Sequence, residues 1–177
     1  MLVLSLTSLA GWEDAVLASL RGASGTLEER DRQIERSGLF GEYPAILSGY
    51  VELLADPETE AEALKRAVFL VWRAAMAPST ATGIASLPEA ASRAVITQLD
   101  AHVRRGSADS ELAWMLAWYV SGGRFVFELY GATAALLDFA DATPPDTWRS
   151  RPITPDTMRQ RGQMGHYWTT LAREDRS

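Results

Sequence analysis

Helix start and stop signals recur along the whole chain, and they constrain its fold more than any other feature. Thr26 and Glu29 have the spacing of a capping box, and Pro44 stands where a helix can begin without losing a hydrogen bond. Alternation of apolar and polar residues with a period of two, which marks half-buried strands, is almost absent. The only strand candidate is segment 1–7, and one strand without a partner forms no sheet. The sequence therefore predicts an all-α fold.

Apolar periodicity predicts seven to eight helices in a single domain spanning residues 1–177, arranged as an irregular helical bundle or as stacked αα-hairpins. Segment 58–78 is apolar on nearly every side in its second half, so we expect it to cross the middle of the core. A proline-rich linker, 143–155, precedes a docked C-terminal helix over 155–173. The pair Gly122–Gly123 permits either a turn between helices or a kink within one.

Charge is distributed unevenly along the chain. Residues 1–141 contain 11 basic and 19 acidic side chains, a net charge of −8, whereas residues 142–177 contain 6 basic and 4 acidic side chains, a net charge of +2. Nucleic acids and anionic membranes are bound mainly through basic side chains, so we expect neither as a partner. We expect the arginines of the C-terminal segment to lie against the acidic body or to face water; they include Arg149, Arg151, Arg159 and Arg161.

Targeting and membrane signals are missing from the sequence. The apolar runs 67–72 and 112–120 are far shorter than the ~20 residues that span a bilayer. The apolar start of the chain lacks the positively charged region of a signal peptide. We therefore expect a soluble, cytoplasmic protein. The absence of cysteine excludes disulfides, thiolate metal sites and cysteine nucleophiles.

The two histidines are the first candidates for chemistry. We expect His102 to be half-exposed near a helix C-terminus, without a functional role. His166 is the better candidate because Arg161, Gln163 and Tyr167 are close to it in sequence. The spacings of helical metal sites, phosphate loops and nucleophile elbows are absent. We therefore predict no catalytic, cofactor-binding or metal-binding residue, and expect a protein that is not an enzyme.

Aromatic residues form a second group of candidates. Trp114 and Trp118 are one helical turn apart, a pattern more typical of a core than of a pocket. Trp148 lies in the linker and should pin it to the body rather than protrude as an anchor. Any exposed face of these rings would favour a partner site. The candidate contacts to a partner or ligand are Arg161, Gln163, His166, Tyr167, Trp148, Trp114 and Trp118.

Two glycines, Gly162 and Gly165, lie in the middle of the predicted last helix, where each costs about 1 kcal/mol relative to alanine. The lack of a Cβ lets another helix or an aromatic ring approach the backbone. We therefore expect a docking seam on this face, with Gln163 and His166 pointing elsewhere. Gly165→Leu should destabilise the fold, whereas His166→Ala should leave folding and binding nearly intact.

Two stretches, APSTATGIASLPEAA (77–91) and RGQMGHYW (161–168), resemble a family of small all-helical bacterial proteins with no assigned activity. The likeness covers residues from about 40 to 171. It implies a bacterial cytosolic helical domain and transfers no residue role. The acidic, compact, cysteine-free chain is also similar in general character to immunity proteins of bacterial toxin systems.

Two functions follow as hypotheses. The leading one is a non-enzymatic protein whose acidic helical surface binds another protein, such as a basic toxin or effector. The alternative is a small-molecule-binding domain or enzyme with a pocket between helices near Trp114, Trp118 and His166. Neither hypothesis requires a cofactor, and both leave the oligomeric state open.

Overall fold

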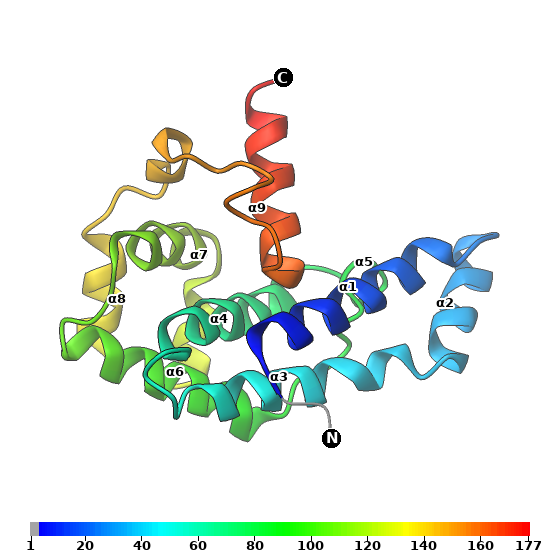
Figure 1. Ribbon diagram of the computed structural model, residues 1–177, viewed down its shortest axis with the longest axis horizontal. Helices are drawn as coiled ribbons and strands as arrows, with labels where there is room; N and C mark the ends of the chain where they lie inside the picture. Colours follow the sequence, from blue (N-terminus) through cyan, green and yellow to red (C-terminus); the bar gives the residue numbers. More distant parts are fainter. Residues whose placement is uncertain (1–3) are drawn as a thin grey trace.

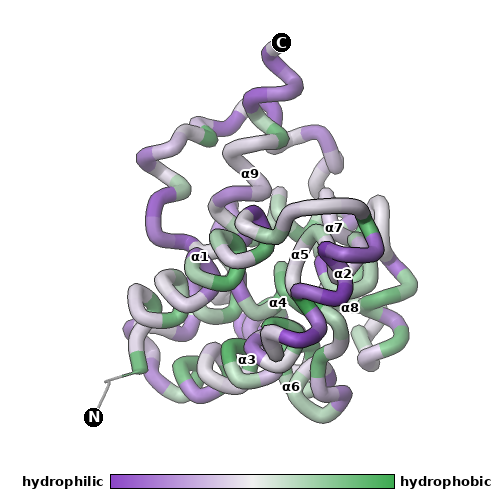
Figure 2. The backbone as a smooth tube through the Cα atoms, turned by 90° about the vertical axis from the view of Figure 1, so that its right-hand side faces the viewer, coloured by the Kyte–Doolittle hydropathy of each residue, from purple (hydrophilic) through white to green (hydrophobic). Residues whose placement is uncertain are grey.

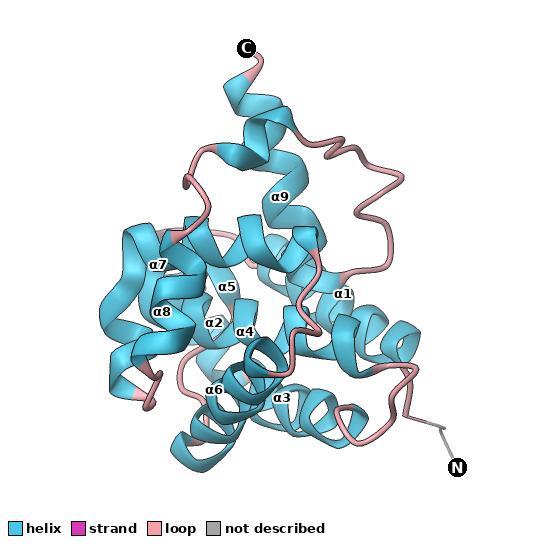
Figure 3. Cartoon of the chain, turned by 90° about the vertical axis from the view of Figure 1, so that its left-hand side faces the viewer, coloured by secondary structure: helices cyan, strands magenta, loops and turns pink. Residues whose placement is uncertain are grey.

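The computed structural model describes residues 4–177, and every regular element among them is helical (Figure 3). Eight of the nine α-helices have seven residues or more, so the all-α prediction is confirmed. Of the strand candidate 1–7, residues 1–3 lie outside the described residues, and Leu6 begins the first helix. The helices are α1 (Leu6–Gly22), α2 (Leu27–Arg36), α3 (Glu42–Leu53), α4 (Glu60–Met76), α5 (Ser79–Thr82), α6 (Glu89–Arg104), α7 (Ser110–Leu129), α8 (Ala134–Asp141) and α9 (Gly162–Asp175), with 3-10 turns at Leu39–Gly41 and Thr147–Ser150.

Helix α4 occupies the middle of the bundle, as its apolar second half predicts. All ten residues from 63 to 72 are buried. Helices α3, α6, α7 and α9 pack against it, and Figure 1 shows it between α1 and α3 on one side and α7 on the other. Neighbouring helices therefore bury residues 63–72 of α4 on every side. Within residues 4–177 no helix, α4 included, combines the length and apolar character needed to cross a bilayer.

The predicted capping box at the start of α2 is present. The amide of Glu29 donates to Thr26 Oγ1 over 3.3 Å, and the amide of Thr26 donates to Glu29 Oε2 over 2.7 Å. Only Ile34 of this helix is buried. Figure 2 shows α2 as a mainly hydrophilic segment at the surface. A strong cap and a single apolar contact are enough to hold this helix against the body.

The two glycines at 122 and 123 produce a kink within α7 rather than a turn between helices. Gly123 departs from helical geometry, with φ −144° and ψ 39°. A Cβ at this position would lie 2.8 Å from Nε1 of Trp72. The absence of a side chain therefore allows α7 to bend closely around the indole of α4.

The last helix begins later than the sequence predicts. It spans Gly162–Asp175 instead of 155–173, and residues 155–160 form turns. Gln160 and Gly162 both have a φ of +58°, a left-handed conformation that interrupts a right-handed helix. The linker is therefore longer than expected. In Figure 1 α9 stands upright beside α1 with its C-terminal end pointing away from the other helices.

The predicted docking seam is confirmed, but its geometry differs from the expectation. Gly162 and Gly165 are buried, together with Met158 and Trp168. A Cβ on Gly165 would overlap the carbonyl oxygen of Met158, and one on Gly162 would overlap the carboxyl of Glu13. Gly162 accepts α1, as predicted. Gly165 instead accepts the turn that precedes its own helix, because the chain reverses at residue 160.

Candidate functional site

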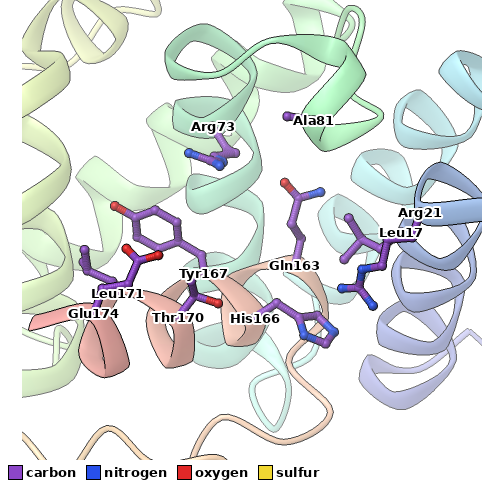
Figure 4. A pocket seen from close by; sticks show the side chains of 10 residues that line it. All are labelled: Leu17, Arg21, Arg73, Ala81, Gln163, His166, Tyr167, Thr170, Leu171 and Glu174. Atoms are coloured by element: carbon purple, nitrogen blue, oxygen red, sulfur yellow. The ribbon is translucent and has the colours of Figure 1, made fainter. Parts of the chain in front are cut away.

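A groove runs along one side of α9, where the helix faces α1 and α4. Its volume is about 360 Å³, within the range of small-molecule sites. The side chains that line it come from α1, α4, α5 and α9 (Figure 4). We call it the α1–α9 groove, and it is lined by Leu17, Arg21, Arg73, Ala81, Gln163, His166, Tyr167, Thr170, Leu171 and Glu174.

Arg73 of α4 supplies a positive charge that the protein does not neutralise. Its Nε is buried without a hydrogen-bond acceptor, and no carboxylate among residues 4–177 forms an ion pair with it. Its guanidinium carbon lies 5.1 Å from the ring centroid of Tyr167, in a cation–π contact. Burial lowers the pKa of Arg73 from its usual value. The site therefore contains a partly desolvated cation whose donors remain available.

Other charged groups of the groove are distributed around its rim. Arg21 of α1 is exposed and adds a second fixed cation, whereas Glu174 near the end of α9 adds one carboxylate. His166 is exposed, and its Nε2 lies 2.8 Å from Oδ1 of Asp14. Two arginines against one lining carboxylate leave an excess of positive charge in a chain whose net charge is −6.

Tyr167 forms an aromatic wall of the groove and is held from behind by three residues. Its hydroxyl accepts a hydrogen bond from Nε1 of Trp118 over 2.7 Å. Its ring centroid lies 5.4 Å from that of Phe69 and 5.5 Å from that of Trp72. Burial raises the pKa of Tyr167, so the hydroxyl stays neutral. These contacts hold the ring rigidly against Arg73.

Gln163 forms the floor of the groove and is fixed by its neighbours. Its Nε2 donates to the hydroxyl of Tyr43 over 2.6 Å and to the carbonyl of Thr82 over 2.9 Å. Its backbone amide donates to Oε2 of Glu13 over 3.0 Å. The sequence-based expectation that Gln163 points away from the docked face is wrong, because the late start of α9 turns this residue inward.

Glu13 is a buried carboxyl behind this floor, with an exposed fraction of 1%. Its Oε1 accepts a hydrogen bond from the hydroxyl of Tyr50 over 2.5 Å. Burial raises the pKa of Glu13 to about 7, against the lowering effect of hydrogen bonds from Tyr50 and Gln163. The carboxyl therefore changes its charge near neutral pH.

Arg161 lies in a buried ion-pair network beside the groove and does not line it. Its guanidinium donates to both oxygens of Glu62 and of Glu111 over 2.6–2.8 Å. Lys65 donates to Glu111 as well, over 2.7 Å. Burial opposes ionisation of Glu111, but these bonds outweigh it and lower its pKa to about 2. Of the two positions expected for Arg161, against the acidic body or facing water, the structure shows the first.

The three candidate tryptophans lie in the core or pack against it. Trp114 and Trp148 are buried, and both pack against Trp168, with centroid distances of 4.7 Å and 6.1 Å. Trp148 therefore pins the linker. The single pocket predicted near Trp114, Trp118 and His166 is divided in the structure. His166 lines the α1–α9 groove, whose lining contains no tryptophan, whereas Trp114 lines a separate hollow of about 250 Å³.

His102 corrects a second expectation. It is buried, with an exposed fraction of 3%, rather than half-exposed. Its Nδ1 lies 3.5 Å from Oε1 of Glu60 at the start of α4. The end of α6 packs against α4, and this contact between distant segments covers the ring.

The lining of the groove combines charged, aromatic and apolar side chains, and its candidate acid–base groups are Glu13 and His166. A general acid or base must reach the reacting group. Glu13 has a pKa near neutrality, but its carboxyl is buried and does not line the groove. His166 is paired with Asp14, and no hydroxyl or carboxylate of the lining is hydrogen-bonded to it. Among residues 4–177, no group of three or more His, Cys, Asp or Glu side chains could hold a metal ion.

Three of the seven sequence candidates meet in the groove: Gln163, His166 and Tyr167. Sequence reasoning missed Arg73 and Glu13, although a signal existed for both. Arg73 directly follows the most apolar run of α4. Glu13 lies four residues after Leu9 and three before Val16, on the buried face of α1. A charged residue at an apolar position of a helix is therefore the pattern that could have identified them.

The chain matches no known family model, and no curated protein or solved structure shows significant similarity to it. The resemblance to a family of small helical bacterial proteins and to toxin-immunity proteins therefore stays a prediction.

Proposed function

We propose that this protein binds a small organic anion in the α1–α9 groove. The observation that carries the proposal is Arg73, a half-buried arginine whose charge meets only an aromatic ring. Interior basic side chains elsewhere in the chain, such as Lys65 and Arg66, are paired with carboxylates. Removing a cation from water without a counter-charge costs free energy. A bound anion would offset this cost because it supplies the missing counter-charge.

The lining indicates the shape of the ligand. Leu17, Leu171 and the ring of Tyr167 offer apolar surface, whereas Arg73 and Arg21 offer donors. Arginine binds carboxylates through two parallel hydrogen bonds. A carboxylate attached to a flat apolar body fits both properties. We therefore propose an aromatic or otherwise apolar carboxylate as the ligand class.

A titration with 2-naphthoate tests the proposal, with the uncharged 2-naphthamide as the matched ligand control. NMR shifts should map the acid to the groove, and the amide should bind more weakly. Arg73→Gln should weaken binding of the acid roughly tenfold or more, because a hydrogen bond to a charged group contributes about 1.5–3 kcal/mol. Arg36→Gln, at an exposed arginine of α2, should change nothing. Equal affinity for acid and amide, or an unaltered affinity in Arg73→Gln, would contradict the proposal.

A second candidate is the protein-binding role favoured by the charge of the chain. Helix α7 exposes Phe125 and Leu129, with exposed fractions of 56% and 63%, one turn apart on its surface. Such an apolar pair on an acidic body suits a basic protein with an apolar anchor. A basic partner should copurify at low salt, dissociate at high salt, and be lost from a Phe125→Ser, Leu129→Ser variant. A partner retained by that variant would place the interface elsewhere.

A further inference from the structure

A buried carboxyl lies directly behind the α1–α9 groove. Glu13 accepts the backbone amide of Gln163, and Gln163 also lines the groove. Gly162 packs against the same carboxyl without a side chain between them. Helix α9 has no side-chain cap of its own at its first turn, so the carboxyl of α1 takes that place. The charge of Glu13 therefore acts on the helix turn that forms the floor of the groove.

The groups that face Glu13 come from every helix packed against it. Helix α3 contributes the hydroxyls of Tyr50 and Tyr43, α4 contributes Arg66, and α1 contributes the neighbouring Asp14. Arg66 donates to Glu62 and to the carbonyl of Leu6, so its charge is already engaged. No basic side chain among residues 4–177 forms an ion pair with Glu13. Its ionised form is therefore held by the hydrogen bonds from Tyr50 and Gln163 and by the charge of Arg66, which is not in direct contact with it.

We propose that Glu13 couples the groove to pH, so that the groove binds its anion when Glu13 carries a proton and releases it when Glu13 ionises. This inference rests on the anion binding proposed above. The ionised carboxylate of Glu13, behind the floor of the groove, repels an anion held by Arg73. The intervening protein screens this repulsion weakly. Burial raises the pKa of Glu13 to about 7, which places the change near neutrality. By linkage, anion binding must then take up a proton.

Affinity for 2-naphthoate measured at pH 6 and pH 8 tests this coupling. The probe stays ionised in this range, since carboxyl pKa values lie near ~4. The unmodified protein should bind about fivefold or more tightly at pH 6, the lower end of couplings between sites. Glu13→Gln should bind equally at both pH values, because its amide oxygen can accept the Gln163 amide and its NH2 group can donate to the Tyr50 hydroxyl, both without a charge. His166→Gln is the matched control and should retain the pH dependence.

Calorimetry of the unmodified protein provides a measurement that needs no variant. In two buffers with different heats of ionisation, binding near pH 7 should show uptake of a proton. The same titration with Glu13→Gln should show none. A pH dependence that persists in Glu13→Gln and disappears in His166→Gln would assign the effect to the histidine and overturn the proposal.

A separate readout distinguishes failure of the coupling from failure of the anion-binding function. If the unmodified protein binds no 2-naphthoate at either pH, the proposed function fails. Hydrogen-exchange protection of the Gln163 amide still reports on Glu13, because that amide donates to its carboxyl. Protection should differ between pH 6 and pH 8 in the unmodified protein and not in Glu13→Gln, with amides of α6 as internal reference. If the protection of the Gln163 amide differs between pH 6 and pH 8 by the same amount in the unmodified protein and in Glu13→Gln, the proposed role of Glu13 is overturned.

Discussion

Arg161 and Arg73 are both withdrawn from water, but the structure meets their charges in opposite ways. Arg161 donates to two carboxylates, those of Glu62 and Glu111, and its pKa is raised because these bonds outweigh its burial. Arg73 faces the ring of Tyr167, and burial lowers its pKa. An arginine whose donors are all hydrogen-bonded, such as Arg161, stabilises the fold. An arginine with free donors beside a groove, such as Arg73, contributes most to the binding of a ligand.

Gly165→Ala tests the close approach at the start of α9. The added methyl would overlap the carbonyl oxygen of Met158, a backbone atom that cannot move without displacing the linker. We expect a loss of about 1–3 kcal/mol in the free energy of unfolding, in the range of overpacked core positions. Gly11→Ala is the control, because nothing lies within 4 Å of a Cβ there. It should stabilise α1 by about 0.5–1 kcal/mol. Urea denaturation measures both, and similar effects in the two variants would contradict the packing described.

His166→Ala should leave the free energy of unfolding within about 1 kcal/mol of the unmodified value. The ring is exposed and its contact with Asp14 is an exposed pair, which contributes little in water. Asp14→Ala serves as the companion variant. A large loss in thermal stability for either would show that the pair holds α9 to α1.

Helix α9 is held by polar contacts to five other helices, among them α1, which it reaches through the Gln163 amide and Glu13. Arg161 joins its start to α4 and α7, Gln163 joins it to α3 and α5, and Trp168 donates to the hydroxyl of Tyr119 in α7 over 2.9 Å. Apolar packing alone tolerates small rotations of a helix, whereas directional bonds do not. These bonds therefore set the rotation of α9, and with it the face presented to the groove.

Arg161→Met tests this anchoring. Removing the guanidinium leaves Glu62 with Arg66 and Glu111 with Lys65 as their remaining basic partners. Because a hydrogen bond to a charged group contributes about 1.5–3 kcal/mol, we expect a loss of that size in the free energy of unfolding. Arg159→Met, two residues earlier, removes an exposed pair with Asp156 and should cost less than about 1 kcal/mol. Chemical denaturation with tryptophan fluorescence measures both, since Trp168 and Trp114 report on the packing of α9. Equal costs would show that the network contributes no more than a surface pair.

At the scale of the whole molecule, the stability contributions of two carboxyls, Glu13 and Glu111, change with pH in opposite directions. The pKa of Glu13 is raised to about 7, and that of Glu111 is lowered to about 2, from ordinary values near 4.5. Glu13 therefore stabilises the fold fully below pH ~4.5, and this stabilisation is lost as the pH rises through about 7. Glu111 stabilises it above pH ~4.5, and its contribution is lost as the pH falls towards 2.

From the contributions of Glu13 and Glu111 alone, we therefore expect the free energy of unfolding to be greatest near pH 4.5–5. Between there and pH 8 the loss from Glu13 should be about 3 kcal/mol, from a shift of about 2.5 pKa units. Glu13→Gln should remove the decline on the alkaline side and leave the acid side unchanged. Denaturation curves at several pH values measure this, and an unaltered alkaline decline in Glu13→Gln would contradict the assignment.

Several features of the fold could be predicted from neighbouring residues alone. The capping box of Thr26 and Glu29, the buried course of α4 and the pinning role of Trp148 are present in the structure. The start of α9 could not be predicted, because its position depends on left-handed conformations at Gln160 and Gly162 that contacts with Glu13 and Met158 support. The sequence itself favours an earlier start, because Thr154 and Pro155 are of the residue types that cap and begin a helix.

The amino-acid order alone specified the helical character of the chain, its central helix and its excess of acid. These properties rest on interactions between residues three or four positions apart and on composition, both visible along one dimension. The groove and its chemistry arise from residues distant in sequence: Glu13 meets Tyr50 across 37 positions and Gln163 across 150, and Gln163 meets Tyr43 across 120. Which of these side chains meet depends on the angles at which helices cross and on the turn before α9. Folding therefore left Arg73 without a counter-charge and placed a titratable carboxyl behind Gln163, at the floor of the groove.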